Sequence, residues 1–242
     1  MEKFFIVSCL RSGYQLLKTY LSSHPEIFCF GEIFGSDRDI RIKSLFDQPV
    51  RVYEEGEDPS KYLDEITYPF KHLSAIGLKI NYSDHKNLFG LQKLPYILRD
   101  EGWKVIHLKR HNMFNNYISL ALASKEDNWH FESYKSSVFI SCSNFIQHFK
   151  KIETCRKNTD LFFKDSSKME VIYEDLCKNP KVVLDEVQRF LGVVTKDNLM
   201  TSMKKQQTRL QSTVLINYRQ IYKEFLNNHK EYFCFLEDTL LL

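Results

Sequence analysis

The sequence predicts an α/β fold in which a mostly parallel sheet lies between two layers of helices. Short apolar segments rich in strand-forming residues alternate with segments of helical periodicity along the 242 residues. No Pro/Gly/Ser-rich linker and no internal repeat divides the chain. Because a chain of this length can bury one sizeable core, we expect a single domain over residues 1–242.

The chain opens with a strand, a tight turn and a helix. Residues 4–9 are apolar and strand-forming, and residues 11–13 interrupt this pattern. Apolar residues then recur at helical spacing as far as Leu21. The helix should end before His24, because a residue that precedes proline avoids the α conformation.

The alternation continues to about residue 191. Residues 37–75 carry many charges and three prolines, which predicts a loop-rich insertion with short helices. Further strands are expected at residues 75–80, 104–108 and 169–173, and helices at residues 113–122, about 138–157 and 180–191. Residues 96–102 resemble the end of a helix with a glycine cap. Ligands of such sheets bind at the carboxyl ends of strands, so the turns after residues 9, 80 and 108 are the places to search.

The composition excludes several classes of protein. The net charge of +3 comes from interspersed acidic and basic residues, which does not indicate a nucleic-acid partner. Six scattered cysteines show no zinc spacing, so we expect free thiols in a reducing compartment and no metal site. The amino-terminal apolar run is too short for a signal peptide, and no segment approaches the about 20 apolar residues of a membrane span. We expect a cytoplasmic protein.

The turn after the first strand, Cys9-Leu10-Arg11-Ser12-Gly13-Tyr14-Gln15, has the features of an anion site. A glycine lets the backbone approach a ligand, the following helix presents N–H groups, and Arg11 adds a full charge. This suits a phosphate or a phosphosulfate. The turn lacks the GxxxxGK[ST] pattern of a Walker A loop. Taken alone, the turn is weak evidence for an anion site, and a purely structural turn is the favoured interpretation.

A second candidate anion site follows the strand at residues 104–108. Arg110 comes directly after the strand, and Ser119 lies on the next helix, so that both side chains can reach one anion. The alternative is a surface arginine and a serine that bonds to its own helix. Two anion sites at the ends of two strands suit a nucleotide with phosphates at both ends.

Four segments resemble those of one known family, in the family's order. The segments are FFIVSCLRSGYQLLKTYLSSHPEIFCFGEIF, WKVIHLKRHNMFNNYISLALA, MEVIYEDLCKNPKVVLDEVQRFLGV and KKQQTRLQSTVLINY, which together extend from about residue 4 to residue 218. They resemble sulfotransferases that use 3′-phosphoadenosine 5′-phosphosulfate (PAPS), and the last segment is similar to the bacterial carbohydrate branch. The resemblance implies a P-loop-like three-layer sandwich in a bacterial enzyme.

The resemblance also implies an activity and a set of site residues. It implies transfer of a sulfuryl group from PAPS to a hydroxyl of a carbohydrate or glycolipid-like acceptor, with release of 3′-phosphoadenosine 5′-phosphate (PAP) and without a metal. Glu32 would be the base, and Arg11 would stabilise the leaving phosphate. The 5′-phosphosulfate would be held by Arg11, Ser12, Gly13, Tyr14 and Gln15, the 3′-phosphate by Arg110 and Ser119, and the closing segment would contain Lys204, Lys205 and Gln206.

Some features depart from the family pattern, and alternatives remain open. Tyr14 and Gln15 stand where small hydroxyl residues are usual in the family, so backbone N–H groups would take the place of the hydroxyl contact to the 5′ side. The alternatives are a nucleotide-dependent kinase of P-loop-like fold and a PAP-binding module without activity. His24 is a second candidate base, with a structural role before Pro25 as its alternative. We expect the acceptor to be a small molecule or a glycan.

Overall fold

The chain forms two compact units in the computed structural model, which describes residues 1–34, 53, 56–81, 94–129, 133–203, 206 and 208–236. The first unit consists of Met1–Lys109 and Cys155–Ser202. The second consists of Arg110–Thr154 and Met203–Leu242. The expectation of one domain over residues 1–242 stays a prediction.

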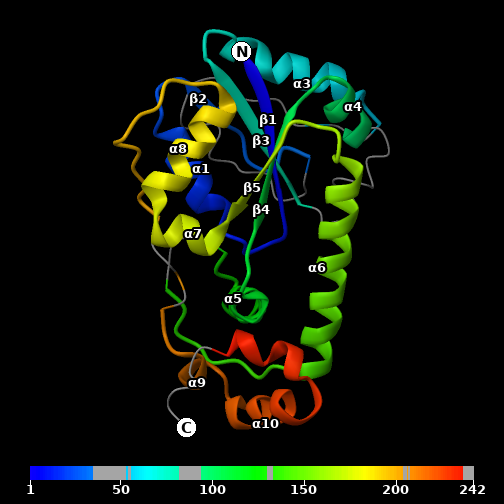
Figure 1. Cartoon of the computed structure of the whole chain (residues 1–242), viewed down its shortest axis with the longest axis vertical. Helices are drawn as coiled ribbons and strands as arrows, with labels where there is room; N and C mark the ends of the chain where they lie inside the picture. The colour runs from blue at the N-terminus through cyan, green and yellow to red at the C-terminus, as the bar shows by residue number, and fades with distance from the viewer. Residues whose placement is uncertain are drawn as a thin grey trace. The chain divides into compact units, whose positions relative to one another are not determined.

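A five-stranded sheet forms the centre of the first unit (Figure 1), and its strand order is β2-β3-β1-β4-β5. All neighbouring strands are parallel. The strands are β1 (Glu2–Ser8), β2 (Ile27–Cys29), β3 (Ala75–Asn81), β4 (Lys104–Lys109) and β5 (Lys168–Ile172). Four of them lie within two residues of the predicted strands. The sequence did not predict β2, because three residues are too few to show a periodicity.

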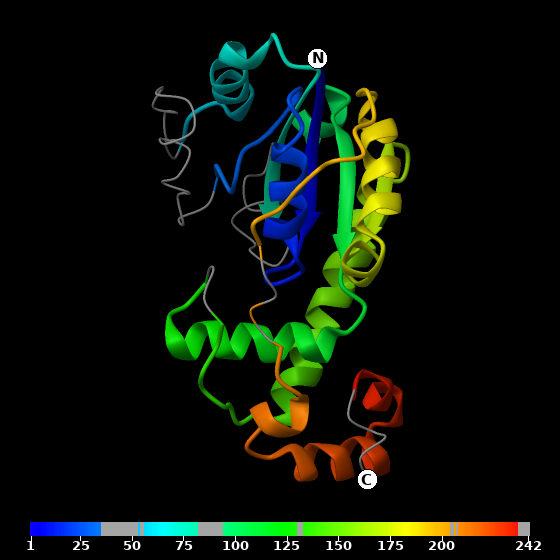
Figure 2. The ribbon, with the colours of Figure 1, turned by 90° about the vertical axis from the view of Figure 1, so that its left-hand side faces the viewer.

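Helices cover both faces of this sheet, as the sequence predicted (Figures 1 and 2). One face carries α1 (Tyr14–Ser22), α7 (Tyr173–Lys178) and α8 (Pro180–Leu191). The other face carries α3 (Pro59–Thr67), α4 (Leu94–Asp100) and the carboxyl-terminal part of α6 (Cys142–Phe162). The short helices α3 and η1 (Tyr68–Phe70) confirm the prediction for the described part of residues 37–75.

Alternate side chains of β1 divide the core of the first unit into two halves. Phe4 and Ile6 point towards α1 and α8, where Leu17 and Val187 are fully buried in the same cluster. Phe5 points to the opposite face, where burial of such rings stabilises the fold by about 2 kcal/mol each. This alternation fixes which polar side chains at the strand ends share a face.

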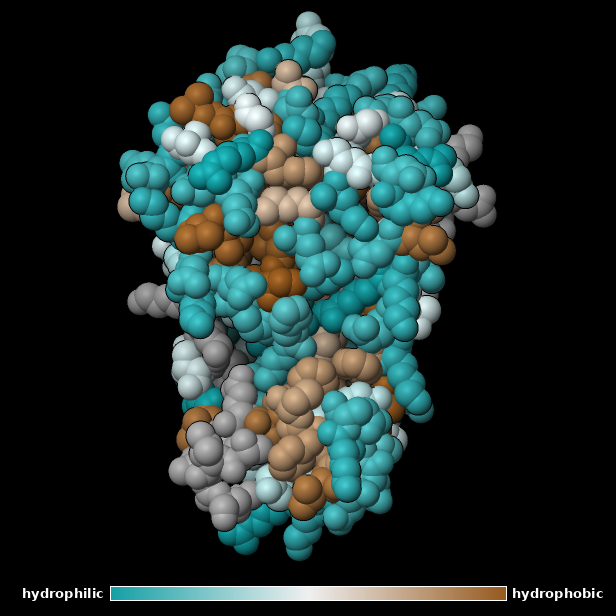
Figure 3. All heavy atoms as spheres, in the orientation of Figure 1, coloured by the Kyte–Doolittle hydropathy of each residue, from teal (hydrophilic) through white to brown (hydrophobic). Residues whose placement is uncertain are grey.

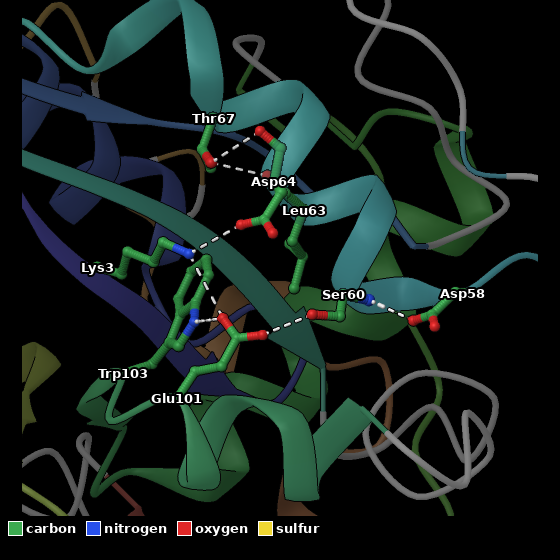
Figure 4. Close-up of polar contacts among 8 residues, drawn as sticks. All are labelled: Lys3, Asp58, Ser60, Leu63, Asp64, Thr67, Glu101 and Trp103. Atoms are coloured by element: carbon green, nitrogen blue, oxygen red, sulfur yellow. Dashed lines mark hydrogen bonds and ion pairs between the residues drawn. The ribbon is translucent and has the colours of Figure 1, made fainter.

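A polar cluster at the amino-terminal edge of the sheet fastens α3 to the strands (Figure 4). The Glu101 carboxylate accepts hydrogen bonds from Ser60 Oγ at 2.7 Å and from the indole N–H of Trp103 at 3.1 Å. Lys3 Nζ lies 3.4 Å from Glu101 and 3.3 Å from Asp64. The cluster therefore lies at the edge of the sheet opposite to the carboxyl ends of the strands.

A charged network joins α6 to β4 and β5. The Asp160 carboxylate accepts hydrogen bonds from His107 Nδ1 at 3.0 Å, Lys109 Nζ at 3.0 Å and Lys168 Nζ at 2.8 Å, and Lys109 also pairs with Glu170. Burial raises the pKa of Asp160, but these hydrogen bonds outweigh burial and hold that pKa far below its usual value. Burial, assisted by the Lys109 charge, lowers the pKa of His107 to about 4. His107 is therefore neutral at physiological pH.

The second unit has an aromatic core. It contains α5 (Met113–Glu126), the amino-terminal part of α6, α9 (Gln211–Val214), α10 (Tyr218–Asn228) and η2 (Lys230–Phe235). The Phe145 ring lies 5.0 Å from that of Phe114, 5.8 Å from that of Phe225 and 5.6 Å from that of Tyr232. These rings tie α5, α6, α10 and η2 together.

Hydrophilic side chains predominate on the molecular face drawn in Figure 3. Within the part of the chain that the structure describes, no helix is long and apolar enough to cross a membrane.

Candidate functional site

The turn after β1 has a backbone that requires glycine at position 13. Gly13 has a φ of 91°, and Arg11 also adopts a positive φ of 60°. A Cβ on residue 13 would lie 2.1 Å from a ring carbon of Tyr173, so the close approach excludes any side chain. The hydroxyl of Ser12 donates to the Cys9 carbonyl at 2.5 Å. The turn is therefore held by internal contacts in one specific conformation.

Helix α1 begins directly after this turn. Gly13 is its N-cap residue, and among the described residues no side chain caps the helix. The first amide groups of a helix have no partner within it, so they are directed at whatever lies before the helix. Arg11 is half-buried beside them. The combination of amide groups, a helix dipole and an arginine fits an anionic group.

Tyr14 and Gln15 differ in their surroundings. The Tyr14 side chain is buried, and its hydroxyl donates to the Phe30 carbonyl at 2.7 Å. This hydrogen bond joins α1 to the segment that follows β2. Gln15 is half-buried on α1. Tyr14 therefore has a structural partner of its own at the position where a small hydroxyl residue is usual.

Glu32 forms an ion pair with Lys79, a residue that the sequence analysis missed. Lys79 Nζ lies 2.7 Å from Glu32 Oε1 and 4.6 Å from the centre of the Tyr14 ring. Lys79 is only 5% exposed, and Glu32 follows β2 at the same edge of the sheet, where the Lys79 amide donates to the Gly31 carbonyl. A lysine inside a mostly apolar strand is rarely buried without a charged partner, which was the signal that could have identified Lys79.

Two more polar side chains lie at the carboxyl ends of β1 and β3. Ser8 and Asn81 are register partners on these adjacent strands, and they are 0% and 2% exposed. Within the described part of the chain, neither Ser8 Oγ nor Asn81 Oδ1 has a hydrogen-bond partner. Asn81 is two residues beyond Lys79, so both point to the same face of the sheet. Buried polar atoms without partners are uncommon in folded proteins, and these two lie at the strand ends where ligands of parallel sheets bind.

Arg110 and Ser119 lie in the second unit. Arg110 follows β4 directly and is 7% exposed, and Ser119 lies on α5 and is 5% exposed. The Asn112 side chain between them caps α5 by accepting a hydrogen bond from the Asn115 amide at 2.8 Å. Arg11 and Glu32, in contrast, belong to the first unit.

The closing segment and the second candidate base complete the predicted set. Lys204 and Lys205 lie outside the described residues, and Gln206 is half-buried. His24 is buried, and its Nδ1 accepts from the Glu26 amide while Nε2 donates to the Val194 carbonyl at 2.8 Å. Both ring nitrogens therefore serve the fold, which favours the structural role of His24.

The residues that the structure describes contain no group of three or more His, Cys, Asp or Glu side chains that could hold a metal ion. The site offers a carboxylate, a buried ammonium, an arginine and the amide groups at the start of a helix. Such a set can bind an anion and accept a proton from a neighbouring hydroxyl.

Comparisons with known proteins agree on one family. The sequence profile of the sulfotransferase family matches residues 3–197. Nodulation protein H of Rhizobium tropici is 25% identical over 249 residues, which span 98% of this chain and 95% of that protein. The crystal structure of a sulfotransferase from Alicyclobacillus acidocaldarius is similar with a TM-score of 0.56 and 17% identity, over 100% of this chain and 96% of that one. This structural similarity confirms the predicted P-loop-like α/β fold.

Proposed function

The chain belongs to the sulfotransferase family and is a sulfotransferase, and we propose that it transfers a sulfuryl group from PAPS to a hydroxyl of a carbohydrate or glycolipid-like acceptor. The single observation that carries the proposal is the arrangement at one edge of the sheet. There, the glycine turn with Arg11 follows β1, and the ion pair of Glu32 and Lys79 lies beside β3. An anion-binding turn next to a carboxylate is what sulfuryl transfer to a hydroxyl requires.

In the proposed reaction, the acceptor hydroxyl attacks sulfur in line with the bond to the 5′-phosphate. A new oxygen–sulfur bond forms, the sulfur–oxygen bond to the phosphate breaks, and its electron pair leaves with PAP. Glu32 takes the acceptor's proton, a role typically worth about 10²–10⁴-fold in rate. Arg11 and the amide groups before α1 stabilise the charge that grows on the leaving phosphate. Lys79 holds the Glu32 carboxylate in place.

The nucleotide contacts of the proposal follow the family resemblance. The 5′-phosphosulfate is held by Arg11, Ser12, Gly13, Tyr14 and Gln15, the 3′-phosphate by Arg110 and Ser119, and the closing segment is formed by Lys204, Lys205 and Gln206. Because the hydroxyls of Ser12 and Tyr14 donate to backbone carbonyls, their contribution is through the backbone. The unpartnered polar atoms of Ser8 and Asn81 support placing the acceptor hydroxyl near Glu32.

Further parts of the proposal concern the cell and the acceptor. The six cysteines, all within the described residues, form no disulfide, which supports a reducing, cytoplasmic location. The similarity to proteins of two bacteria supports a bacterial source. The acceptor is proposed to be a small molecule or a glycan.

Substitution of the proposed base tests this function. Glu32→Gln should keep PAP binding in calorimetry and lower transfer from labelled PAPS to a panel of glycans and glycolipids by at least about tenfold. The matched control is Glu26→Gln, which removes a different carboxylate, directly before β2. This variant should transfer the sulfuryl group at the rate of the original protein. Unchanged transfer by Glu32→Gln would show that Glu32 is not the base.

The two alternatives give different results in the same assays. A PAP-binding module would bind PAP and transfer nothing to any acceptor. A kinase would transfer phosphate from ATP and require magnesium, but the turn lacks the Walker A lysine.

A further inference from the structure

Three carboxamide side chains form a hydrogen-bonded network with the end of the carboxyl-terminal helix η2: Asn112 and Asn115 at the start of α5, and Gln211 at the start of α9. The Phe235 carbonyl accepts hydrogen bonds from Asn112 Nδ2 at 3.1 Å and from Gln211 Nε2 at 2.9 Å. Gln211 Nε2 also donates to Asn115 Oδ1 at 2.9 Å. All of these residues belong to the second unit. One main-chain carbonyl near the carboxyl terminus is therefore fastened to the first turn of α5.

Gln211 and Asn115 are buried and Asn112 is half-buried, so their hydrogen bonds restrict the orientation of the groups that they join. Gln211 is 1% exposed and Asn115 is 9% exposed. A buried amide without its partner costs about 1–3 kcal/mol, so the network strongly disfavours any other position of the first turn. Apolar side chains of similar size would fill the same space, but they would not fix the orientation of the first turn of α5.

The network lies next to a proposed ligand contact. Asn112 is two residues after Arg110, and its Oδ1 caps α5 while its Nδ2 binds Phe235. The family profile ends at residue 197, so Gln211 and Phe235 come from a part of the chain beyond the matched region. A segment outside the matched region thus contacts the turn from which Arg110 extends.

We propose that Asn112 and Gln211 are positioning residues, which orient Arg110 for the 3′-phosphate by fastening η2 to the first turn of α5. The inference rests on the proposed function, because it assigns the 3′-phosphate to Arg110. An arginine recognises a phosphate through a fork of donors whose geometry must be set before binding. If Arg110 is no longer held in this geometry, binding of a nucleotide with a 3′-phosphate weakens. Binding of a nucleotide without a 3′-phosphate does not change.

Two variants and two nucleotides test the inference. Gln211→Met removes the carboxamide at nearly constant size, and Asn112→Ser keeps a capping oxygen but removes the donor to Phe235. Calorimetry compares PAP with adenosine 5′-monophosphate (AMP), which lacks the 3′-phosphate. Each variant should bind PAP about tenfold more weakly, the loss expected from one or two hydrogen bonds, and should bind AMP within about twofold of the original protein.

Asn217→Leu is the matched control. Asn217 accepts from the Ile140 amide at 3.1 Å and donates to the Ile140 carbonyl at 2.8 Å, so it is a carboxamide clamp of the same unit away from the start of α5. Its substitution should leave the ratio of PAP to AMP affinity unchanged. Thermal unfolding without ligand checks that each variant is folded, and if Gln211→Met is not, Asn112→Ser decides.

The outcomes separate the inference from the function on which it rests. Equal losses for PAP and AMP, or no loss for either, in a folded variant would overturn the positioning role. An original protein that binds neither PAP nor PAPS would overturn the proposed function itself.

Discussion

Glu32 and Lys79 are joined by a contact of 2.7 Å between a carboxylate that follows β2 and an ammonium in the middle of β3. The Lys79 side chain is almost completely buried, and the Tyr14 ring lies 4.6 Å from its charge. Because a buried ammonium is stable only with a charged partner, the pair fixes the Glu32 carboxylate at the carboxyl edge of the sheet. This edge also carries the turn with Arg11.

Removal of the ammonium should therefore affect catalysis more than nucleotide binding. In Lys79→Met the Glu32 carboxylate loses its partner and its fixed position, so we expect transfer to fall at least about tenfold. PAP affinity, measured by calorimetry, should change by less than about threefold, because the phosphate contacts are made elsewhere. Lys71→Met, at an exposed lysine, is the control. Transfer at the original rate in Lys79→Met would refute the positioning of Glu32 by this pair.

The turn after β1 should not tolerate a side chain at position 13. Gly13→Ala combines a positive φ with a clash against the Tyr173 ring, so we expect a loss of roughly 2–5 kcal/mol in the free energy of unfolding and loss of PAP binding. Gly102→Ala also has a positive φ, but nothing lies within 4 Å of the added Cβ. Urea unfolding should show a smaller loss for this control, of about 1–2 kcal/mol. Equal losses would mean that the contact with Tyr173 is unimportant.

The neutral, buried His107 should make stability depend on pH. Its pKa of about 4 in the folded protein lies below the unfolded value of 6.5, so the unfolded chain binds more protons between these values. Stability contributed by His107 is complete above about pH 6.5 and is lost as the pH falls to 4, by roughly 3 kcal/mol at most. His107→Asn retains a hydrogen-bond donor for Asp160, and its thermal unfolding temperature should vary less between pH 4 and pH 6.5 than that of the original protein. An identical pH profile in the variant would contradict the assignment.

The cluster in Figure 4 should matter for stability and not for transfer. Glu101→Ala removes the acceptor of the Ser60 and Trp103 hydrogen bonds, so the free energy of unfolding should fall by about 1–2 kcal/mol. The exposed pair of Lys3 and Asp64 should contribute less than about 1 kcal/mol, as Asp64→Asn would show. Transfer per folded molecule should not change in either variant. A selective loss of transfer in Glu101→Ala would contradict a purely structural role.

The elements with strong local signals were predictable from the sequence. The apolar run of β1, the glycine turn and the periodicity of α1 occur within about 20 residues, so local rules identify them. Helix α8 likewise begins at Pro180 and ends before Gly192, as predicted. Gly192 has a φ of 72°, a backbone conformation that suits glycine and ends a helix. Helix α6 begins at residue 142 and not at about 138, and it extends to residue 162, beyond the predicted end at 157, since no proline or glycine marks its end.

Contacts made across the sheet were not predictable. The family resemblance identified Glu32 as a candidate base, but its partner Lys79 is 47 residues away and becomes a neighbour only through the register of β3. The same is true of Ser8 and Asn81, which are paired by the strand register alone. The Tyr14 hydroxyl finds its partner in Phe30, beside a strand of three residues that no periodicity could reveal.

The most direct test of the central claim is calorimetry of PAP and AMP with Arg11→Met and Arg110→Met. If Arg11 binds the 5′ side and Arg110 binds the 3′-phosphate, Arg11→Met should weaken the binding of both nucleotides. Arg110→Met should weaken the binding of PAP by about tenfold or more and leave the affinity for AMP unchanged. Equal weakening of PAP and AMP by Arg110→Met, or unchanged PAP binding by both variants, would contradict the account.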